Sequence, residues 1–150
     1  MAFPYKKILC PIDFDNSSLH ALGEAVAIAH QLGASITVVH VVPMVLEFPD
    51  LPHTFDRYAE EEKAARAKLE QIVAQKVRGV SCQSATYVGD VIGCLLEAAD
   101  KFDPDLLVMA THGREGMVHL LLGSVAEALV RKMRCPVLTV RAAGPGERSP

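Results

Sequence analysis

The sequence predicts an α/β fold, a single doubly wound five-stranded parallel sheet with helices on both faces. Short apolar runs alternate with longer amphipathic stretches along the whole chain, as in successive βαβ units. The apolar runs are nearly continuous, which is typical of strands buried on both faces. A chain of 150 residues is long enough for one domain with a sizeable core.

The first two predicted strands flank a helix. The strands are residues 6–13 (KKILCPID) and 35–42 (SITVVHVV). The helix between them is expected to have Ser17 or Ser18 as its N-cap and to stop at Gly33. Its core-facing side is expected to carry Leu19, Leu22, Val26 and Ala29.

A proline-rich segment and a charged helix follow. Residues 43–55 contain three prolines and are expected to form a long loop that serves as a lid or as a partner surface. Residues 56–77 are predicted to be helical, with Gly79 ending the helix and with Glu62 and Arg66 paired one turn apart. The apolar side of this helix is expected to carry Tyr58, Ala65, Leu69, Ile72 and Val73.

The second half of the chain continues the alternation. The predicted elements are a strand at 80–89, a helix capped by Asp90 that runs to 102, a strand at 105–110, a helix at 124–133 and a strand at 136–141. One domain is expected to cover residues 1–141. The tail at 142–150 is expected to be disordered.

The composition argues against several classes of partner and site. A formal net charge of -3 and a pI of about 6.0 provide no basic stripe for nucleic acid. No apolar run approaches the roughly 18 residues of a membrane helix, and the N-terminus lacks a secretory pattern, so we expect a cytoplasmic protein. The cysteines are scattered without a CxxC pair, which argues against a zinc site or a disulfide framework. They are Cys10, Cys82, Cys94 and Cys135.

The expected strand order, 3-2-1-4-5, makes a Rossmann-like sheet whose winding reverses between the first and fourth strands. Sheets of this kind bind ligands at the carboxyl ends of the strands at this point. Asp13 ends the first strand, and residues 110–113 lie at the end of the fourth. The two stretches are therefore expected to face each other across one ligand site.

The segment THGREGMVHLLLGS carries glycines suited to binding a phosphate. Gly113 and Gly116 allow a tight turn whose backbone amides face an anion. Gly123 lies just before the next helix, where free amides and the helix dipole favour an anion, and Ser124 adds a hydroxyl. Arg114 is a cation placed to meet phosphates. The pattern is neither a Walker A loop nor G-x-G-x-x-G.

These residues also have purely local explanations. Ser124 and Glu127 match the S-x-x-E capping box, which needs no ligand. Asp13 either accepts from a ribose or adenine donor, or has a local role, which is to cap the first helix or to satisfy loop amides. Arg114 is either a ligand or a solvated charge. No histidine shows a metal-binding pattern, and no serine, cysteine or carboxylate pair is organised for catalysis.

A family resemblance covers nearly the whole chain. KKILCPIDF, VVHVV, DLLVMATHG and RCPVLTVR resemble the first, second, fourth and last strands of the universal stress protein family. The family's nucleotide motif, G-x2-G-x9-G-[ST], is matched by Gly113, Gly123 and Ser124. Ala110 stands in the place of the motif's first glycine, which adds one methyl group beside the adenosine position and leaves the phosphate loop whole.

The resemblance implies an ATP-binding, homodimeric stress-response protein that takes ATP with or without Mg²⁺. The adenosine pocket is then lined by Pro11, Ile12, Asp13, Val41, Met109 and Ala110. The phosphates are surrounded by Gly113, Arg114, Gly116, Gly123, Ser124 and Val125. The last strand, 136–141, is apolar and expected at the sheet edge, so we also expect it to pair with a second copy.

Three functions are compatible with these features, and we favour the first. It is an ATP-binding regulatory protein whose nucleotide biases a conformation or a partner, with slow or absent hydrolysis. The second is a nucleotide-independent dimeric interaction protein whose glycine loop is purely structural. The third, an ATP-hydrolysing or nucleotidyl-transferring enzyme, lacks a visible base and metal carboxylates.

Overall fold

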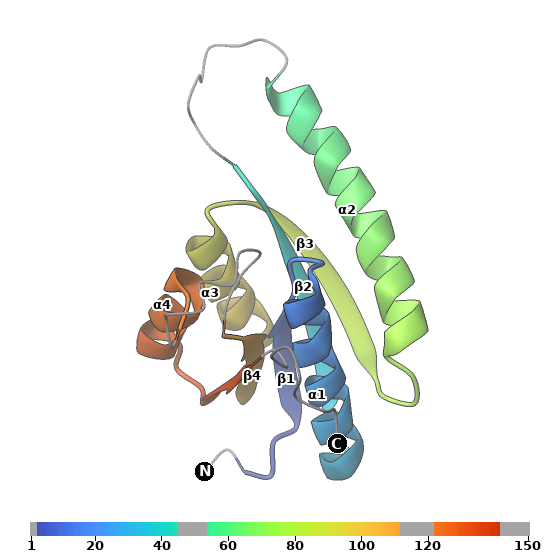
Figure 1. The fold of residues 1–150 in the computed structure, drawn as a ribbon, viewed down its shortest axis with the longest axis vertical. Helices are drawn as coiled ribbons and strands as arrows, with labels where there is room; N and C mark the ends of the chain where they lie inside the picture. The colour runs from blue at the N-terminus through green and yellow to red at the C-terminus, as the bar shows by residue number, and fades with distance from the viewer. Residues whose placement is uncertain (1–2, 45–53, 112–121, 142–150) are drawn as a thin grey trace, which may run out of the picture.

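Strands and helices alternate through residues 3–44, 54–111 and 122–141, the part of the chain that the computed structural model describes (Figure 1). The strands are β1 (Lys7–Pro11), β2 (Ser35–Pro43), β3 (Cys82–Gly89), β4 (Leu106–Ala110) and β5 (Val137–Val140). The helices are α1 (Asn16–Leu32), α2 (Thr54–Lys76), α3 (Val91–Phe102) and α4 (Ser124–Lys132). Most of the predicted loop at 43–55 and the tail at 142–150 lie outside the described residues.

The strands form one sheet in the order β3-β2-β1-β4-β5, and each neighbouring pair is parallel. This confirms the predicted fold class and strand order. Ile8 of β1 lies opposite Ile36 of β2 on one side and Leu106 of β4 on the other. β1 is therefore the central strand, and the winding reverses between β1 and β4.

The helices cover both faces of the sheet. α1 and α2 pack on one face, over a core that includes Ile8, Leu22 and Leu69. α3 and α4 pack on the other face, where the core includes Leu9 and Leu129. Consecutive residues of β1 thus enter different cores, because side chains alternate across a strand. Figure 1 shows the two pairs of helices on opposite sides of the sheet.

The predicted core-facing residues of α1 and α2 lie mostly in or against the core. They are Leu19, Leu22, Val26, Ala29, Ala65, Leu69, Ile72 and Val73. Tyr58, also predicted on this face, is half-buried. The helical spacing of apolar residues therefore predicted which sides of these helices are buried.

The N-cap of α1 is Asp15, so the prediction of Ser17 or Ser18 is wrong. The Ser18 amide donates to Oδ1 of Asp15 at 2.9 Å, because a carboxylate is a strong acceptor for a free first-turn amide. The Ser18 hydroxyl instead accepts from the Asp13 amide at 3.2 Å and donates to the Asp15 carbonyl at 3.1 Å. Gly33 ends the helix as predicted, with φ 63°.

α4 begins one residue earlier than a capping box would place it. Its N-cap is Gly123, and Ser124 is the first helical residue, so the predicted capping box of Ser124 and Glu127 is wrong. The Gly123 amide donates to the Thr111 carbonyl at 2.7 Å, which fixes the start of the helix at this glycine. The Glu127 side chain pairs with Arg131 at 3.0 Å instead of reaching back to the cap.

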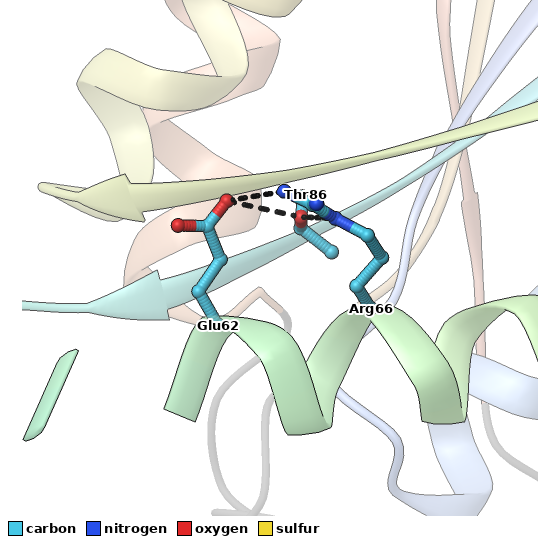
Figure 2. Close-up of polar contacts among 3 residues, drawn as sticks. All are labelled: Glu62, Arg66 and Thr86. Atoms are coloured by element: carbon cyan, nitrogen blue, oxygen red, sulfur yellow. Dashed lines mark hydrogen bonds and ion pairs between the residues drawn. The ribbon is translucent and has the colours of Figure 1, made fainter. Parts of the chain in front are cut away.

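The predicted pair of Glu62 and Arg66 is present on α2, with a guanidinium nitrogen 2.8 Å from the carboxylate. Nε of Arg66 donates to Oγ1 of Thr86 on β3 at 3.4 Å, and this hydroxyl donates to Glu62 at 3.5 Å (Figure 2). The three side chains therefore join α2 to an edge strand of the sheet. α2 ends at Lys76, before Gly79, whose φ of 73° helps to form the turn into β3.

Candidate functional site

A cavity of about 730 Å³ opens at the carboxyl edge of the sheet, where the winding reverses. Its walls come from both helical layers. Val91 and Leu95 of α3 line it on one side, and Ala64 and Ala65 of α2 line it on the other. This is the place that the topology predicts for a ligand. The volume lies within the range of pockets that hold small molecules and cofactors.

The predicted site residues that the structure describes all line this cavity. They are Pro11, Ile12, Asp13, Val41, Met109, Ala110, Gly123, Ser124 and Val125. Gly113, Arg114 and Gly116 lie outside the described residues. The fold therefore brings the ends of β1, β2 and β4 together with the start of α4. That these residues contact a nucleotide remains a prediction.

Asp13 lies at the end of β1, in a turn that its own side chain helps to organise. Oδ1 of Asp13 accepts from the Asp15 amide at 3.2 Å. Asp13 thus satisfies a loop amide, one of its two local explanations, while the capping role belongs to Asp15. Burial raises the pKa of the Asp15 carboxyl, and the nearby Asp13 carboxyl raises it further. The turn therefore holds two interacting carboxyl groups at the N-terminus of α1.

The start of α4 faces the same cavity from the other helical layer. Gly123, Ser124, Val125 and Ala126 all line it. Gly123 has extended backbone angles, φ −70° and ψ 167°, and no side-chain cap hydrogen bond is formed there. The first-turn amides and the positive end of the helix dipole are therefore presented to the cavity, which suits an anionic group.

A model of the universal stress protein family matches residues 4–141. The chain belongs to the universal stress protein family. Universal stress protein MJ0531 of Methanocaldococcus jannaschii is 34% identical over 143 residues, which cover 91% of this chain and 82% of that protein. The sequence resemblance that rested on four strand segments and one motif is thus confirmed.

Solved structures of similar proteins share the fold. The structure of protein MJ0577, from the same organism, has a TM-score of 0.84 and 25% identity, with 94% of this chain and 99% of that one covered. A universal stress protein solved in complex with cAMP has a TM-score of 0.62 and 26% identity, with 91% and 97% covered. The family fold therefore extends over nearly all of both chains in each comparison.

Ala110, which replaces the first glycine of the family motif, is the last residue of β4 and lines the cavity. It lies opposite Val140 of β5 in the strand register and is nearly buried. The next residue, Thr111, donates its amide to the Val140 carbonyl at 3.0 Å. The alanine methyl group therefore belongs to a regular strand end, and the strand pairing is kept around it.

Several cavity residues were not predicted from the sequence. α2 contributes Glu61 and Lys68, and the turn after β1 contributes Phe14. His40 of β2 also lines the cavity, with Nδ1 hydrogen-bonded to the Ile12 carbonyl oxygen at 2.8 Å. The spacing of Glu61, Ala65 and Lys68 places them on one helix face. Only the folded chain shows that this face reaches the cavity.

Among the described residues no cluster of metal-binding side chains is found, and burial raises the pKa of all four cysteine thiols. Burial raises the pKa of the Cys10 thiol to about 12, so this thiol is a core residue rather than a reactive one. In residues 3–44, 54–111 and 122–141 no three His, Cys, Asp or Glu side chains gather where they could hold a metal ion. Within the same ranges, no helix is both long and apolar enough to cross a membrane. Absence of catalysis stays a prediction.

Proposed function

We propose that this universal stress protein is a regulatory protein that binds an adenine nucleotide, ATP with or without Mg²⁺, with slow or absent hydrolysis. The nucleotide lies in the cavity between β1 and β4. Its adenosine contacts the apolar strand ends and the Asp13 carboxylate, and its phosphates lie at the start of α4. Any Mg²⁺ arrives with the phosphates, whose oxygens are its usual ligands.

The observation that carries this proposal is the missing side-chain cap of α4. At α1, the Asp15 carboxylate accepts from a first-turn amide, and at α3 Asp90 does the same for Gly93 at 2.8 Å. Gly123 of α4, which lines the cavity, has no such group. An aspartate here would repel a phosphate, whereas glycine leaves the amides to the ligand.

The family comparison supports the same class of ligand. One similar structure holds cAMP, an adenine nucleotide. The apolar walls of the cavity suit a base and a ribose, while the α4 end suits an anion. One cavity thus offers an apolar part and an anion-binding part, which is the arrangement that a nucleotide requires.

A valine at position 123 tests the proposal. The extended backbone of Gly123 accepts any residue, so the fold is expected to persist. The branched side chain blocks the phosphates, and ATP affinity falls by roughly tenfold or more, a loss above ~1.4 kcal/mol. Calorimetric titration measures this loss, and circular dichroism checks the fold. The control is Gly23→Ala on α1, where an added Cβ meets nothing within 4 Å and binding stays unchanged.

The alternative is a nucleotide-independent dimeric interaction protein with a structural glycine loop. This alternative is preferred if the wild-type protein binds no ATP at millimolar concentration and if mass spectrometry of the purified protein detects no nucleotide carried from the cell. The alternative is also preferred if Gly123→Val binds ATP as tightly as the wild type does.

The partner that we propose is a second copy of the chain, joined through the predicted strand 136–141. β5 is an edge strand of the sheet, and Leu138 on it is 41% exposed. An open apolar edge favours pairing with another strand. A two-fold axis pairs two β5 strands antiparallel and covers Val137, Leu138 and Val140 or their neighbours.

A further inference from the structure

Three side chains from separate elements are stacked at one wall of the cavity. The Phe14 ring, from the turn after β1, stacks on the His40 imidazole of β2 with centroids 4.1 Å apart and an interplanar angle of 25°. The ammonium of Lys68, from α2, lies over the same ring, 4.6 Å from its centroid. All three residues line the cavity. We call this group the Phe14 stack.

Phe14 has an unusual backbone conformation for a bulky residue. Its φ is 71°, in the left-handed region that residues other than glycine, asparagine and aspartate seldom adopt. This conformation turns the chain directly after Asp13, so that the Asp15 amide reaches back to the Asp13 carboxylate at 3.2 Å. The position of that carboxylate therefore depends on the conformation of Phe14.

The stack supplies contacts that hold this conformation. The Phe14 ring packs on His40, which is 7% exposed. Nδ1 of His40 is hydrogen-bonded to the Ile12 carbonyl oxygen at 2.8 Å. The Ile12 amide in turn donates to the Val39 carbonyl at 2.8 Å. The imidazole, on β2, is thus fixed to the residue that directly follows β1. Lys68 connects α2 to the Phe14 ring through a cation–π contact.

We propose that Phe14 and Lys68 are positioning residues, which act through the stack to fix the turn that presents the Asp13 carboxylate to the nucleoside part of the ligand. This inference rests on the proposed nucleotide binding. It adds that α2 takes part in recognition, although α2 carries no residue of the family motif. The stack comes from β2, α2 and the turn after β1, whereas the proposed phosphate position is at the start of α4.

Paired substitutions test the two positions. Lys68→Met removes the charge and keeps most of the chain length, whereas Lys68→Arg keeps a cation over the ring. Phe14→Leu removes the ring, whereas Phe14→Tyr keeps it. The matched control is Lys63→Met, since Lys63 is exposed on the same helix and does not line the cavity. Calorimetric titration of each variant uses ATP, adenosine and inorganic tripolyphosphate.

The expected losses follow from the contacts removed. Lys68→Met weakens ATP and adenosine binding by about two- to fivefold, and Phe14→Leu weakens both by about tenfold. Lys68→Arg and Phe14→Tyr keep the wild-type affinity for ATP and adenosine. Tripolyphosphate binds all the variants with equal affinity. The proposal is overturned if Lys68→Met and Phe14→Leu bind ATP like the wild type. It is also overturned if tripolyphosphate loses as much affinity as ATP, because Lys68 then contacts phosphate directly.

Amide exchange in the ligand-free protein tests the same role without a nucleotide. The Asp15 and Ser18 amides both donate to carboxylates of the turn, at 3.2 and 2.9 Å. Their exchange, followed by NMR, accelerates in Lys68→Met and Phe14→Leu and stays at the wild-type rate in Lys68→Arg and Lys63→Met. Unchanged exchange in the first two variants refutes the positioning role. If the wild type binds no adenine nucleotide, the proposed function fails, and exchange alone decides whether the stack orders the turn.

Discussion

Aspartate and glycine at the N-cap of a helix have opposite effects on anion binding there. Asp90, the N-cap of α3, supplies its own negative acceptor to the first-turn amides, whereas Gly123, the N-cap of α4, has no side chain that could do so. Ser124 follows that glycine as the first helical residue and lines the cavity. Because it is not the cap, its hydroxyl is expected to serve the ligand more than the helix.

Alanine at Ser124 therefore separates binding from stability. Ser124→Ala is expected to lower ATP affinity by about tenfold through the lost hydrogen bond to a charged phosphate. The free energy of unfolding changes by less than about 0.5 kcal/mol. Asp90→Ala is the converse control. It costs about 1 kcal/mol of stability, as lost caps do, and leaves ATP affinity unchanged. Calorimetry and urea unfolding measure the two quantities. A large loss of stability in Ser124→Ala contradicts the cap assignment.

At the scale of elements, the hydrogen bonds of β5 decide which of its residues face a partner. The carbonyls of Pro136 and Val140 accept from the amides of Leu107 and Thr111. In a parallel ladder, alternate residues point their backbone groups to the same side, so Leu138 also points toward β4. The amide of Thr139 therefore points to the open edge, where a second copy is proposed to bind.

Proline at Thr139 is the substitution that tests this edge. Thr139→Pro removes an outward amide and keeps the bonds to β4, which edge strands tolerate. The proposed dimer is expected to become a monomer in sedimentation at micromolar concentration, with the circular dichroism of the wild type. Val140→Pro is the contrasting variant, since it removes a bond within the sheet and destabilises the fold itself. A wild type that sediments at 16.2 kDa, or a dimeric Thr139→Pro, counts against the interface.

At the scale of the whole molecule, the cavity is bounded by both helical layers. Leu22 of α1 and Leu129 of α4 lie in separate cores, and neither lines the cavity. A ligand that touches both layers stabilises the fold as one unit. Its contribution to the unfolding free energy is therefore expected to be independent of which core has been weakened.

Cavity-forming variants in the two cores check this expectation. Leu22→Ala and Leu129→Ala remove side chains that are 0% exposed, and each is expected to cost about 2–5 kcal/mol. ATP at 100 times its dissociation constant adds about 2.7 kcal/mol to either variant. Urea unfolding with and without ATP measures both effects. Rescue of one variant alone shows that the two helical layers do not unfold as one cooperative unit.

The sequence predicts the fold well because its signals are local and repeated. Apolar runs and helical spacing placed each strand and helix to within a few residues. The cap of α1 was missed because several capping residues compete within one turn, as at Asp15 and Ser18. The cap of α4 was missed because a hydrogen bond from Gly123 to the distant Thr111 fixes the helix start. Phe14 and Lys68 were missed because their contact joins distant segments, and because no pattern marks a phenylalanine that adopts a left-handed backbone.

One main-chain path links the open edge of the sheet to the start of α4. The Val140 carbonyl accepts from the Thr111 amide, and the Thr111 carbonyl accepts from the Gly123 amide. The proposed phosphate position at the first turn of α4 is therefore connected by main-chain hydrogen bonds to the end of β5. Thermodynamic linkage then requires reciprocity: if ATP tightens self-association by some factor, self-association tightens ATP binding by that same factor. If the coupling is positive, the apparent affinity for ATP rises with protein concentration, and if the two events are uncoupled it stays constant.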